Sequence, residues 1–143
     1  SNLAKAFLIP IFETAVLDEE AVPLLKELKE NGYLTGLISN TPWGSPSYLW
    51  LQELNRHGLT QYLDDVVFCV DAGRRKPHPD IFHYALERLE VSAQDTIFVG
   101  DDPKWDIYGA RQAGISPILL NPAEGVVTDD ESIRRLSELV ERV

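Results

Sequence analysis

Four short apolar segments, separated by longer stretches with helical spacing, constrain the fold of this chain more than any other feature of its sequence. They contain mainly Val, Ile, Leu and Phe without regular alternation of apolar and polar residues, and they lie at 33–39, 66–70, 96–100 and 116–120. Strands with this pattern are buried on both faces, as in a parallel sheet that helices cover on both sides. With right-handed crossovers, the pattern predicts an α/β fold with a doubly wound parallel sheet.

Helical patterns lie between and after these strands. Apolar residues recur at helical spacing in the segments 18–32, 45–58, 78–91, 105–114 and 130–143. The first 17 residues differ, because they are largely apolar but contain Pro10. We expect them to form a broken helix that leads into a single domain at 18–143.

The composition of the chain bears on which partners it binds and in which compartment it works. The formal charge of −10 argues against nonspecific binding to nucleic acid, because phosphate backbones attract clusters of Lys and Arg. No run of about 18 apolar residues is present, so no membrane-spanning helix is expected. The single cysteine, Cys69, cannot form an internal disulfide, which favours a reducing cytoplasm. The N-terminal segment has no secretory pattern, and we expect an internal start rather than a processed secreted chain.

Three carboxylates follow the predicted strand at 96–100. Asp101 and Asp102 come directly after Gly100, and Asp106 lies near the start of the next predicted helix. Like charges at one strand end repel, and a hard divalent cation such as Mg²⁺ relieves that repulsion. The sequence therefore predicts a Mg²⁺ site formed by the three aspartates. The alternative is that Asp102 caps the following helix while Asp101 is a solvated loop residue.

Polar residues at two further positions are expected on the same edge of the sheet, where ligands of such folds bind. Ser39 and Asn40 end the strand at 33–39 and offer hydroxyl and amide groups to a substrate phosphate or carboxylate oxygen; the alternative is an ordinary turn. Lys76 precedes the helix at 78–91, where an ammonium opposes the helix dipole. That position suits an anion or a neighbouring carboxylate, and the alternative is a solvated loop lysine.

Three segments resemble, in order, the second, third and fourth motifs of the haloacid dehalogenase-like (HAD) hydrolase superfamily: GLISNT, RRKPHPDIF and FVGDDPKWDIYGARQAG. The resemblance covers about residues 18–125. It implies a Rossmann-like, three-layer α/β/α core, with 1–17 as a residual cap or linker segment. It also implies hydrolysis of phosphate monoesters through an aspartyl-phosphate.

The resemblance also assigns roles to the residues at the predicted sheet edge. Ser39 is expected to hydrogen-bond the phosphoryl group, and Lys76 to neutralise the nucleophile and the phosphoryl oxygens. Asp101 is expected to bind Mg²⁺. Asp106, together with Asp102, is expected to support the metal site and Lys76.

The family's first motif, D-x-D-x-[TV], is missing, because no Asp in the chain is followed two positions later by another Asp. In the family this motif supplies the nucleophile and the general acid/base and lies on the central strand. We therefore expect the chain to be the C-terminal portion of such a hydrolase, inactive alone, with a gap or an exposed apolar edge in its sheet. Such an edge predicts dimerisation or complementation by a strand. Residues 6–12 are one candidate for that strand, although Pro10 disfavours them.

Two functions from different classes follow. The first is a part of a Mg²⁺-dependent hydrolase, most simply a phosphatase of a small phosphorylated metabolite. The second is a noncatalytic HAD-like module that binds or regulates a partner. A dehalogenase is disfavoured because that branch works without metal, and a response-regulator-like receiver is disfavoured because the order of Lys76 and the acidic segment differs.

Overall fold

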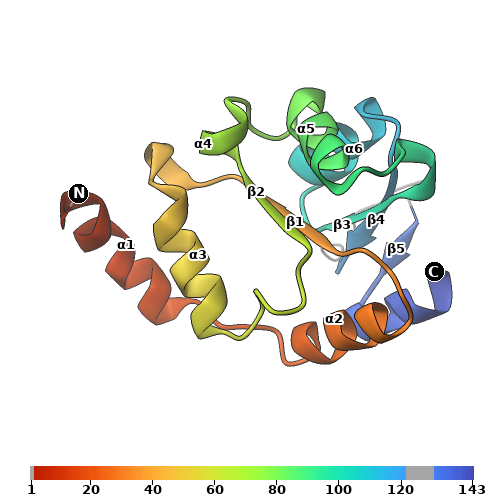
Figure 1. Cartoon of the computed structure of the whole chain (residues 1–143), viewed down its shortest axis with the longest axis horizontal. Coiled ribbons are helices and arrows are strands. Elements are labelled where there is room, and N and C mark those ends of the chain that lie inside the picture. The colour runs from red at the N-terminus through yellow and green to blue at the C-terminus, as the bar shows by residue number, and fades with distance from the viewer. Residues whose placement is uncertain (1, 122–130) are drawn as a thin grey trace.

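The computed structural model describes residues 2–121 and 131–143 and has helices on both sides of a set of parallel strands (Figure 1). The strands are β1 (Gly36–Ser39), β2 (Asp65–Phe68), β3 (Ile97–Gly100), β4 (Ser116–Leu120) and β5 (Ser132–Ile133). The α-helices are α1 (Asn2–Thr14), α2 (Ala21–Glu30), α3 (Ser47–Arg56), α4 (Cys69–Ala72), α5 (Pro79–Leu89) and α6 (Gly109–Gln112). Shorter turns are the 3-10 helices η1 (Pro42–Gly44), η2 (Ala93–Asp95) and η4 (Leu136–Arg142), and the π-helical η3 (Pro103–Tyr108). The predicted doubly wound parallel α/β fold is confirmed.

The strands form two separate parallel groups rather than one continuous sheet. β1 pairs with β2, and β3 pairs with β4, which pairs with β5. β1 and β3 do not pair with each other in the part of the chain that the structure describes. The gap predicted from the missing first motif is therefore present, and it lies between β1 and β3.

Burial along the strands supports the same conclusion. On β2 and β4, Val67, Phe68, Ile118 and Leu119 are all at most 2% exposed. On β1 and β3 the side chains are at best half-buried, and Ile97 is 37% exposed. The central strands of a helix-covered parallel sheet are normally its most buried ones. Here β1 and β3 have the sequences of central strands and the burial of edge strands.

A cavity of about 850 Å³, which we call the slot, lies between β1 and β3. Its walls are mostly apolar and include Leu37 on β1, Phe98 on β3 and Leu86 on α5. Lys76 and Asp106 also line it, at the end to which β1 and β3 point their carboxyl termini. The slot therefore combines an apolar body with a charged end.

Two hydrophobic cores cover the strands from opposite sides, and Figure 1 shows α5 and α6 on one side and α2 with η4 on the other. The first core joins α5 and α6 to both strand groups; within it, Phe82 on α5 meets Phe98 on β3 edge to face, with ring centroids 5.0 Å apart. The second core packs Leu24 and Leu28 of α2 against Ile118 of β4 and the C-terminal segment.

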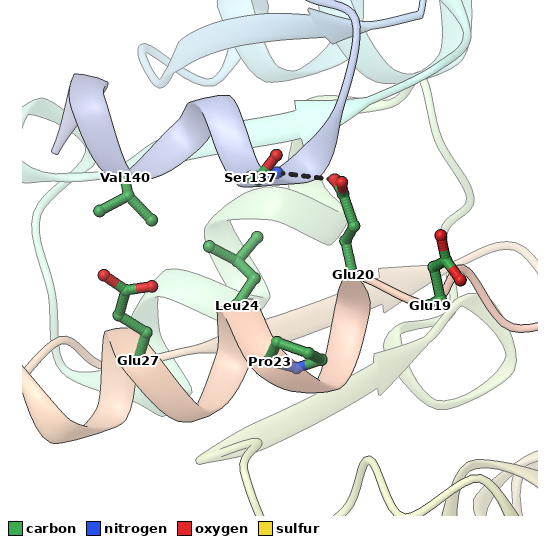
Figure 2. Close-up of a pocket in the computed structure, with 7 residues that line it drawn as sticks. All are labelled: Glu19, Glu20, Pro23, Leu24, Glu27, Ser137 and Val140. Carbon is green, nitrogen blue, oxygen red and sulfur yellow. Dashed lines mark hydrogen bonds between the residues drawn. The ribbon is translucent and has the colours of Figure 1, made fainter.

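The C-terminal segment differs from the predicted helix at 130–143. Residue 130 lies outside the described residues, and the remainder forms β5 and η4. Glu20, before α2, holds this segment, because its carboxylate pairs with the Arg135 guanidinium. The same carboxylate accepts a hydrogen bond of 3.0 Å from the Ser137 N–H (Figure 2). Leu24 and Val140 line the shallow pocket beside these contacts. These long-range contacts fix the segment in a form that local periodicity did not predict.

The predicted strand at 66–70 is wrong at its end, because Cys69 and Val70 begin α4. Cys69 turns toward the loop after β1, where its sulfur accepts a hydrogen bond of 3.3 Å from the Thr41 N–H. An apolar run alone does not distinguish the end of a buried strand from the start of a helix.

The N-terminal segment forms one helix, α1, that runs through Pro10, so the prediction of a broken helix is wrong. It packs on α3, where Phe12 and Trp50 meet edge to face at 5.0 Å. The Arg56 guanidinium also donates a hydrogen bond of 3.3 Å to the Phe12 carbonyl. Residues 6–12 are thus helical and do not fill the slot as a strand. Among the described helices, none has the length and apolar character needed to cross a membrane.

Candidate active site

A buried ion pair joins the loop before α5 to the turn after β3. The Lys76 ammonium donates a hydrogen bond of 2.6 Å to Asp106 Oδ1, and the two side chains are only 12% and 6% exposed. Asp106 Oδ2 accepts a hydrogen bond of 3.1 Å from the Asp102 N–H. Both carboxylate oxygens are thus engaged, as a buried charge requires. The structure brings together two of the residues that the sequence singled out in separate segments of the chain.

Two glycines, whose role the sequence did not reveal, allow this close packing. A Cβ on Gly100 would lie 2.4 Å from the Asp106 Cβ, and a Cβ on Gly109 would lie 3.0 Å from the Pro77 backbone. Gly100 ends β3 directly behind the buried carboxylate, so only a residue without a side chain fits there. The sequence did contain a signal for this role of Gly100. The glycine lies at the end of a predicted strand, directly before Asp101 and Asp102 and three residues before the next helical turn.

Asn40 holds the backbone of Lys76. Its side-chain NH₂ donates to the Lys76 carbonyl at 3.0 Å, and its side-chain oxygen accepts from the Lys76 N–H at 2.9 Å. The following Lys76–Pro77 peptide bond is cis. The amide that was expected to bind substrate is therefore used to join the end of β1 to the Lys76 loop. This contact spans 36 positions of sequence and has no local signature.

Ser39 ends β1 opposite Phe68 of β2 and is half-buried. Its hydroxyl makes no hydrogen bond to any other residue in the described ranges 2–121 and 131–143. Lys76 is tied to the same strand end through Asn40. A free hydroxyl at the carboxyl end of a parallel strand is in the position where such folds bind ligands.

The three predicted metal ligands have different surroundings. Asp102 caps η3, with Oδ1 accepting hydrogen bonds from the N–H groups of Lys104 at 2.8 Å and Trp105 at 2.6 Å. Asp106 is paired with Lys76. Asp101 is exposed, borders the slot and has no side-chain partner among the described residues.

These surroundings fit a Mg²⁺ ion only in part. Among the described residues, no three His, Cys, Asp or Glu side chains are grouped as a metal site. Mg²⁺ is usually held by one or two carboxylates together with water and phosphate oxygens. The free Asp101 carboxylate meets that need, whereas the carboxylates of Asp102 and Asp106 already accept hydrogen bonds from the protein.

An aromatic and cationic rim borders the buried pair. The Arg75 guanidinium lies 5.6 Å from the centre of the Trp105 ring, and Trp105 is 44% exposed. Arg75 precedes Lys76, and Trp105 precedes Asp106. Each member of the rim is therefore adjacent in sequence to a member of the buried pair.

Comparison with known proteins adds family information to this geometry. A family model described as haloacid dehalogenase-like hydrolase matches residues 3–114. The ribulose-1,5-bisphosphate 5-phosphatase of Halopiger xanaduensis is 31% identical over 136 residues, which cover 95% of this chain and 55% of that protein. The chain thus spans about half the length of this curated relative.

Solved structures of similar fold include both phosphatases and dehalogenases. A HAD phosphatase from Thermococcus onnurineus superposes with a TM-score of 0.81 at 30% identity, over 94% of this chain and 61% of that one. A 2-haloacid dehalogenase from Pseudomonas syringae superposes with a TM-score of 0.75 at 32% identity, over 90% of this chain and 53% of that one.

Proposed function

Because this chain belongs to the haloacid dehalogenase-like hydrolases, we propose that it is part of a Mg²⁺-dependent phosphatase that acts on a small phosphorylated metabolite. The observation that carries the proposal is the buried pair of Lys76 and Asp106 at the carboxyl ends of the parallel strands. The phosphatases among the similar proteins support the reaction class.

In this proposal each residue has a role that its surroundings permit. Lys76 has three ammonium protons, and Asp106 accepts one of them, so the others are available to phosphoryl oxygens. Ser39 donates its free hydroxyl to one of these oxygens, and Asn40 fixes the Lys76 backbone. Fixed donors of this kind stabilise the charge that develops during phosphoryl transfer.

Asp101 is the proposed Mg²⁺ ligand, with Asp102 and Asp106 shaping the turn around it. When bound, the metal would supply a positive charge that neutralises phosphoryl oxygens. The residues of this chain do not complete the site, and further ligands are expected from the segment that carries the missing first motif.

The 143-residue chain is proposed to be inactive alone. Its sequence lacks D-x-D-x-[TV], and positioning and electrostatics do not replace a covalent nucleophile. We further propose a cytoplasmic location, supported by the lone free Cys69. The partners proposed are a small phosphorylated substrate and, for the open slot, a complementing strand or a second copy.

A noncatalytic HAD-like module is the alternative from another class, favoured by the absent nucleophile motif. A dehalogenase is a weaker alternative, favoured by the similarity to a 2-haloacid dehalogenase. The retained Asp101 argues for the phosphatase.

The deciding experiment begins with the coding sequence upstream of residue 1. If it encodes D-x-D-x-[TV], the long form is assayed with p-nitrophenyl phosphate and Mg²⁺, beside Lys76→Met and Ser39→Ala variants and the 143-residue chain. We expect hydrolysis by the long form alone, strongly reduced by either substitution. A natural start near residue 1, or a long form that releases chloride from 2-chloropropionate but no phosphate, would contradict the phosphatase proposal.

A further inference from the structure

The rim formed by Arg75 and Trp105 lies beside the buried pair of Lys76 and Asp106, but on the exposed side of it. Lys76 and Asp106 line the slot, and their side chains are only 12% and 6% exposed. Arg75 is exposed, and Trp105 is 44% exposed. The same two segments of the chain therefore meet twice, once through a buried ion pair and once through a cation–π contact at the surface.

The backbone of each rim residue is fixed by hydrogen bonds. The Trp105 N–H donates a hydrogen bond of 2.6 Å to Asp102 Oδ1, and the Arg75 carbonyl accepts one of 3.0 Å from the His78 N–H. Trp105 also belongs to the π-helical η3, and π-helical turns are frequent at functional sites. A ligand that binds at the rim therefore needs to order little of the protein, which favours its affinity.

The cation–π contact leaves the hydrogen-bond donors of Arg75 available. A ring attracts the charge of a guanidinium but offers its N–H groups no lone pair. Within residues 2–121 and 131–143, the Arg75 side chain has no carboxylate or carbonyl partner. Its neighbour Arg74 differs, because the Arg74 Nε lies 3.7 Å from Asp80 Oδ2. Pairs of guanidinium N–H donors bind carboxylate and phosphate groups in a bidentate manner, so Arg75 is suited to an oxyanion.

The surroundings of the candidate site direct a bound substrate toward this rim. In the proposed function, Lys76 and Ser39 bind the phosphoryl group. The body of the slot is apolar, so the polar remainder of a phosphate ester is not expected to enter it. That remainder would extend toward solvent, where Arg75 follows the exposed side of the Lys76 loop. The exposed Asp101 carboxylate would not repel an anionic remainder there if it binds Mg²⁺, because the metal offsets its charge.

We propose that the rim is a second oxyanion subsite, which selects phosphate monoesters that carry a further carboxylate or phosphate group. Arg75 binds that group through its N–H donors, and Trp105 is a positioning residue that holds the guanidinium. The identification of the ligand as a substrate rests on the proposed function. The affinity of the rim for an oxyanion rests only on the surroundings of Arg75 and Trp105.

The test compares three probes that share one phosphate ester. They are glycerol 3-phosphate, 3-phosphoglycerate, which adds a carboxylate, and propane-1,3-diol bisphosphate, which adds a phosphate. Each is titrated into the 143-residue chain while the indole N–H signal of Trp105, identified by its loss in Trp105→Phe, is followed by NMR. We expect a doubly anionic probe to shift this signal and to bind about fivefold more tightly than glycerol 3-phosphate, because it adds charge-assisted hydrogen bonds. The tighter of the two doubly anionic probes shows whether the group is a carboxylate or a phosphate.

Arg75→Gln and Arg74→Gln are a matched pair, because each removes one exposed positive charge and only Arg75 contacts Trp105. Arg75→Gln should abolish the preference for the doubly anionic probe, and Arg74→Gln should change it less than about twofold. Trp105→Leu keeps the charge but removes the ring that positions it, so the preference should fall to about twofold. Unfolding midpoints near that of wild type would show that the three variants fold.

Several results would overturn the proposal. Equal losses in the two arginine variants would show that only the overall charge matters. A full preference in Trp105→Leu would remove the positioning role of the ring. A Trp105 signal that none of the probes shifts would remove the subsite, because both rim residues are present in the 143-residue chain.

Steady-state kinetics of the long form separates the rim from the reaction. We expect a lower KM for the doubly anionic probe that binds more tightly, and Arg75→Gln should raise that KM more than it lowers kcat. Hydrolysis with no preference among the probes would keep the phosphatase and overturn the rim as a subsite. Preferential binding by the 143-residue chain, combined with an inactive long form, would support the rim as an oxyanion site and refute the phosphatase.

Discussion

Substitution of Gly100 by Ala tests whether the close approach of β3 to Asp106 is essential. The added Cβ would lie 2.4 Å from Asp106 Cβ, 2.5 Å from Cγ and 2.6 Å from Oδ2. These distances leave no room, so the aspartate must move. Because Asp106 is 5% exposed and holds both Lys76 and the Asp102 N–H, any movement breaks hydrogen bonds that solvent does not replace.

The size of the effect follows from the ion pair and hydrogen bond that this movement breaks. Breaking a buried ion pair typically costs about 3–5 kcal/mol, and overpacking alone costs about 1–3 kcal/mol. We expect Gly100→Ala to lower the free energy of unfolding by about 3 kcal/mol. The free energy of unfolding of a typical domain is only about 5–15 kcal/mol, so this loss would be large. With a urea dependence of about 2 kcal/mol/M, the unfolding midpoint should fall by about 1.5 M.

Gly36→Ala is the matched control, because Gly36 is a glycine of the other strand that borders the slot. Its added Cβ would come closest to the tip of the Leu89 side chain, at 2.9 Å, which a rotation relieves. Urea unfolding followed by tryptophan fluorescence should place this variant within about 1 kcal/mol of wild type. A midpoint for Gly100→Ala that matches the Gly36→Ala midpoint would refute the argument that Gly100 makes room for the buried carboxylate.

Three further substitutions test neighbouring contacts. Asn40→Ala removes both hydrogen bonds to the Lys76 backbone and should cost about 2 kcal/mol in urea unfolding. Asn40→Asp keeps the acceptor but sets a carboxylate oxygen against the Lys76 carbonyl, so it should cost at least as much; a stable Asn40→Asp variant would contradict the two-bond arrangement. Asp102→Ala removes the cap of η3 and should cost about 1 kcal/mol, and Asp102→Asn should restore most of it in thermal melts. The Arg88 guanidinium donates to Asp65 and lowers the pKa of that carboxyl below 3.8. The stability from this pair should therefore be present near pH 6 and lost as the pH falls below 3.8, so the gap between wild type and Asp65→Asn should narrow from pH 6 to pH 3, and a constant gap would contradict it.

The fold was predictable where sequence and tertiary environment agree. Mainly apolar runs predicted β4 at its observed position and β3 to within one residue, because side chains of both strands pack into the hydrophobic cores. The prediction failed where a distant contact decides the local form. Glu20 binds Arg135 across 115 positions and holds a 3-10 turn where periodicity predicts an α-helix. Cys69, predicted to lie in a strand, begins α4 instead, and its sulfur accepts a hydrogen bond from the Thr41 N–H, 28 positions away.

The candidate site was predictable in its location and less so in its contacts. Ser39 ends β1 and Asp101 follows β3, as the predicted strand ends indicate. Lys76, in the loop before α5, is tied to the end of β1 through Asn40 and pairs with Asp106. The hydrogen bonds between Asn40 and Lys76 depend on a loop that no spacing rule describes. The cap made by Asp102 was one of two open interpretations, because a carboxylate before a helix suits both a cap and a cation.

The packing of Phe82 on Phe98 has a consequence for cooperativity. In the part of the chain that the structure describes, no backbone ladder joins β1 to β3, and side chains of α5 are a main link between the two strand groups. Proteins open in such contiguous units, each with its own free energy. Amides of β2 and β4 should therefore exchange hydrogen with two distinct opening energies in this chain, and a strand bound in the slot should merge them into one.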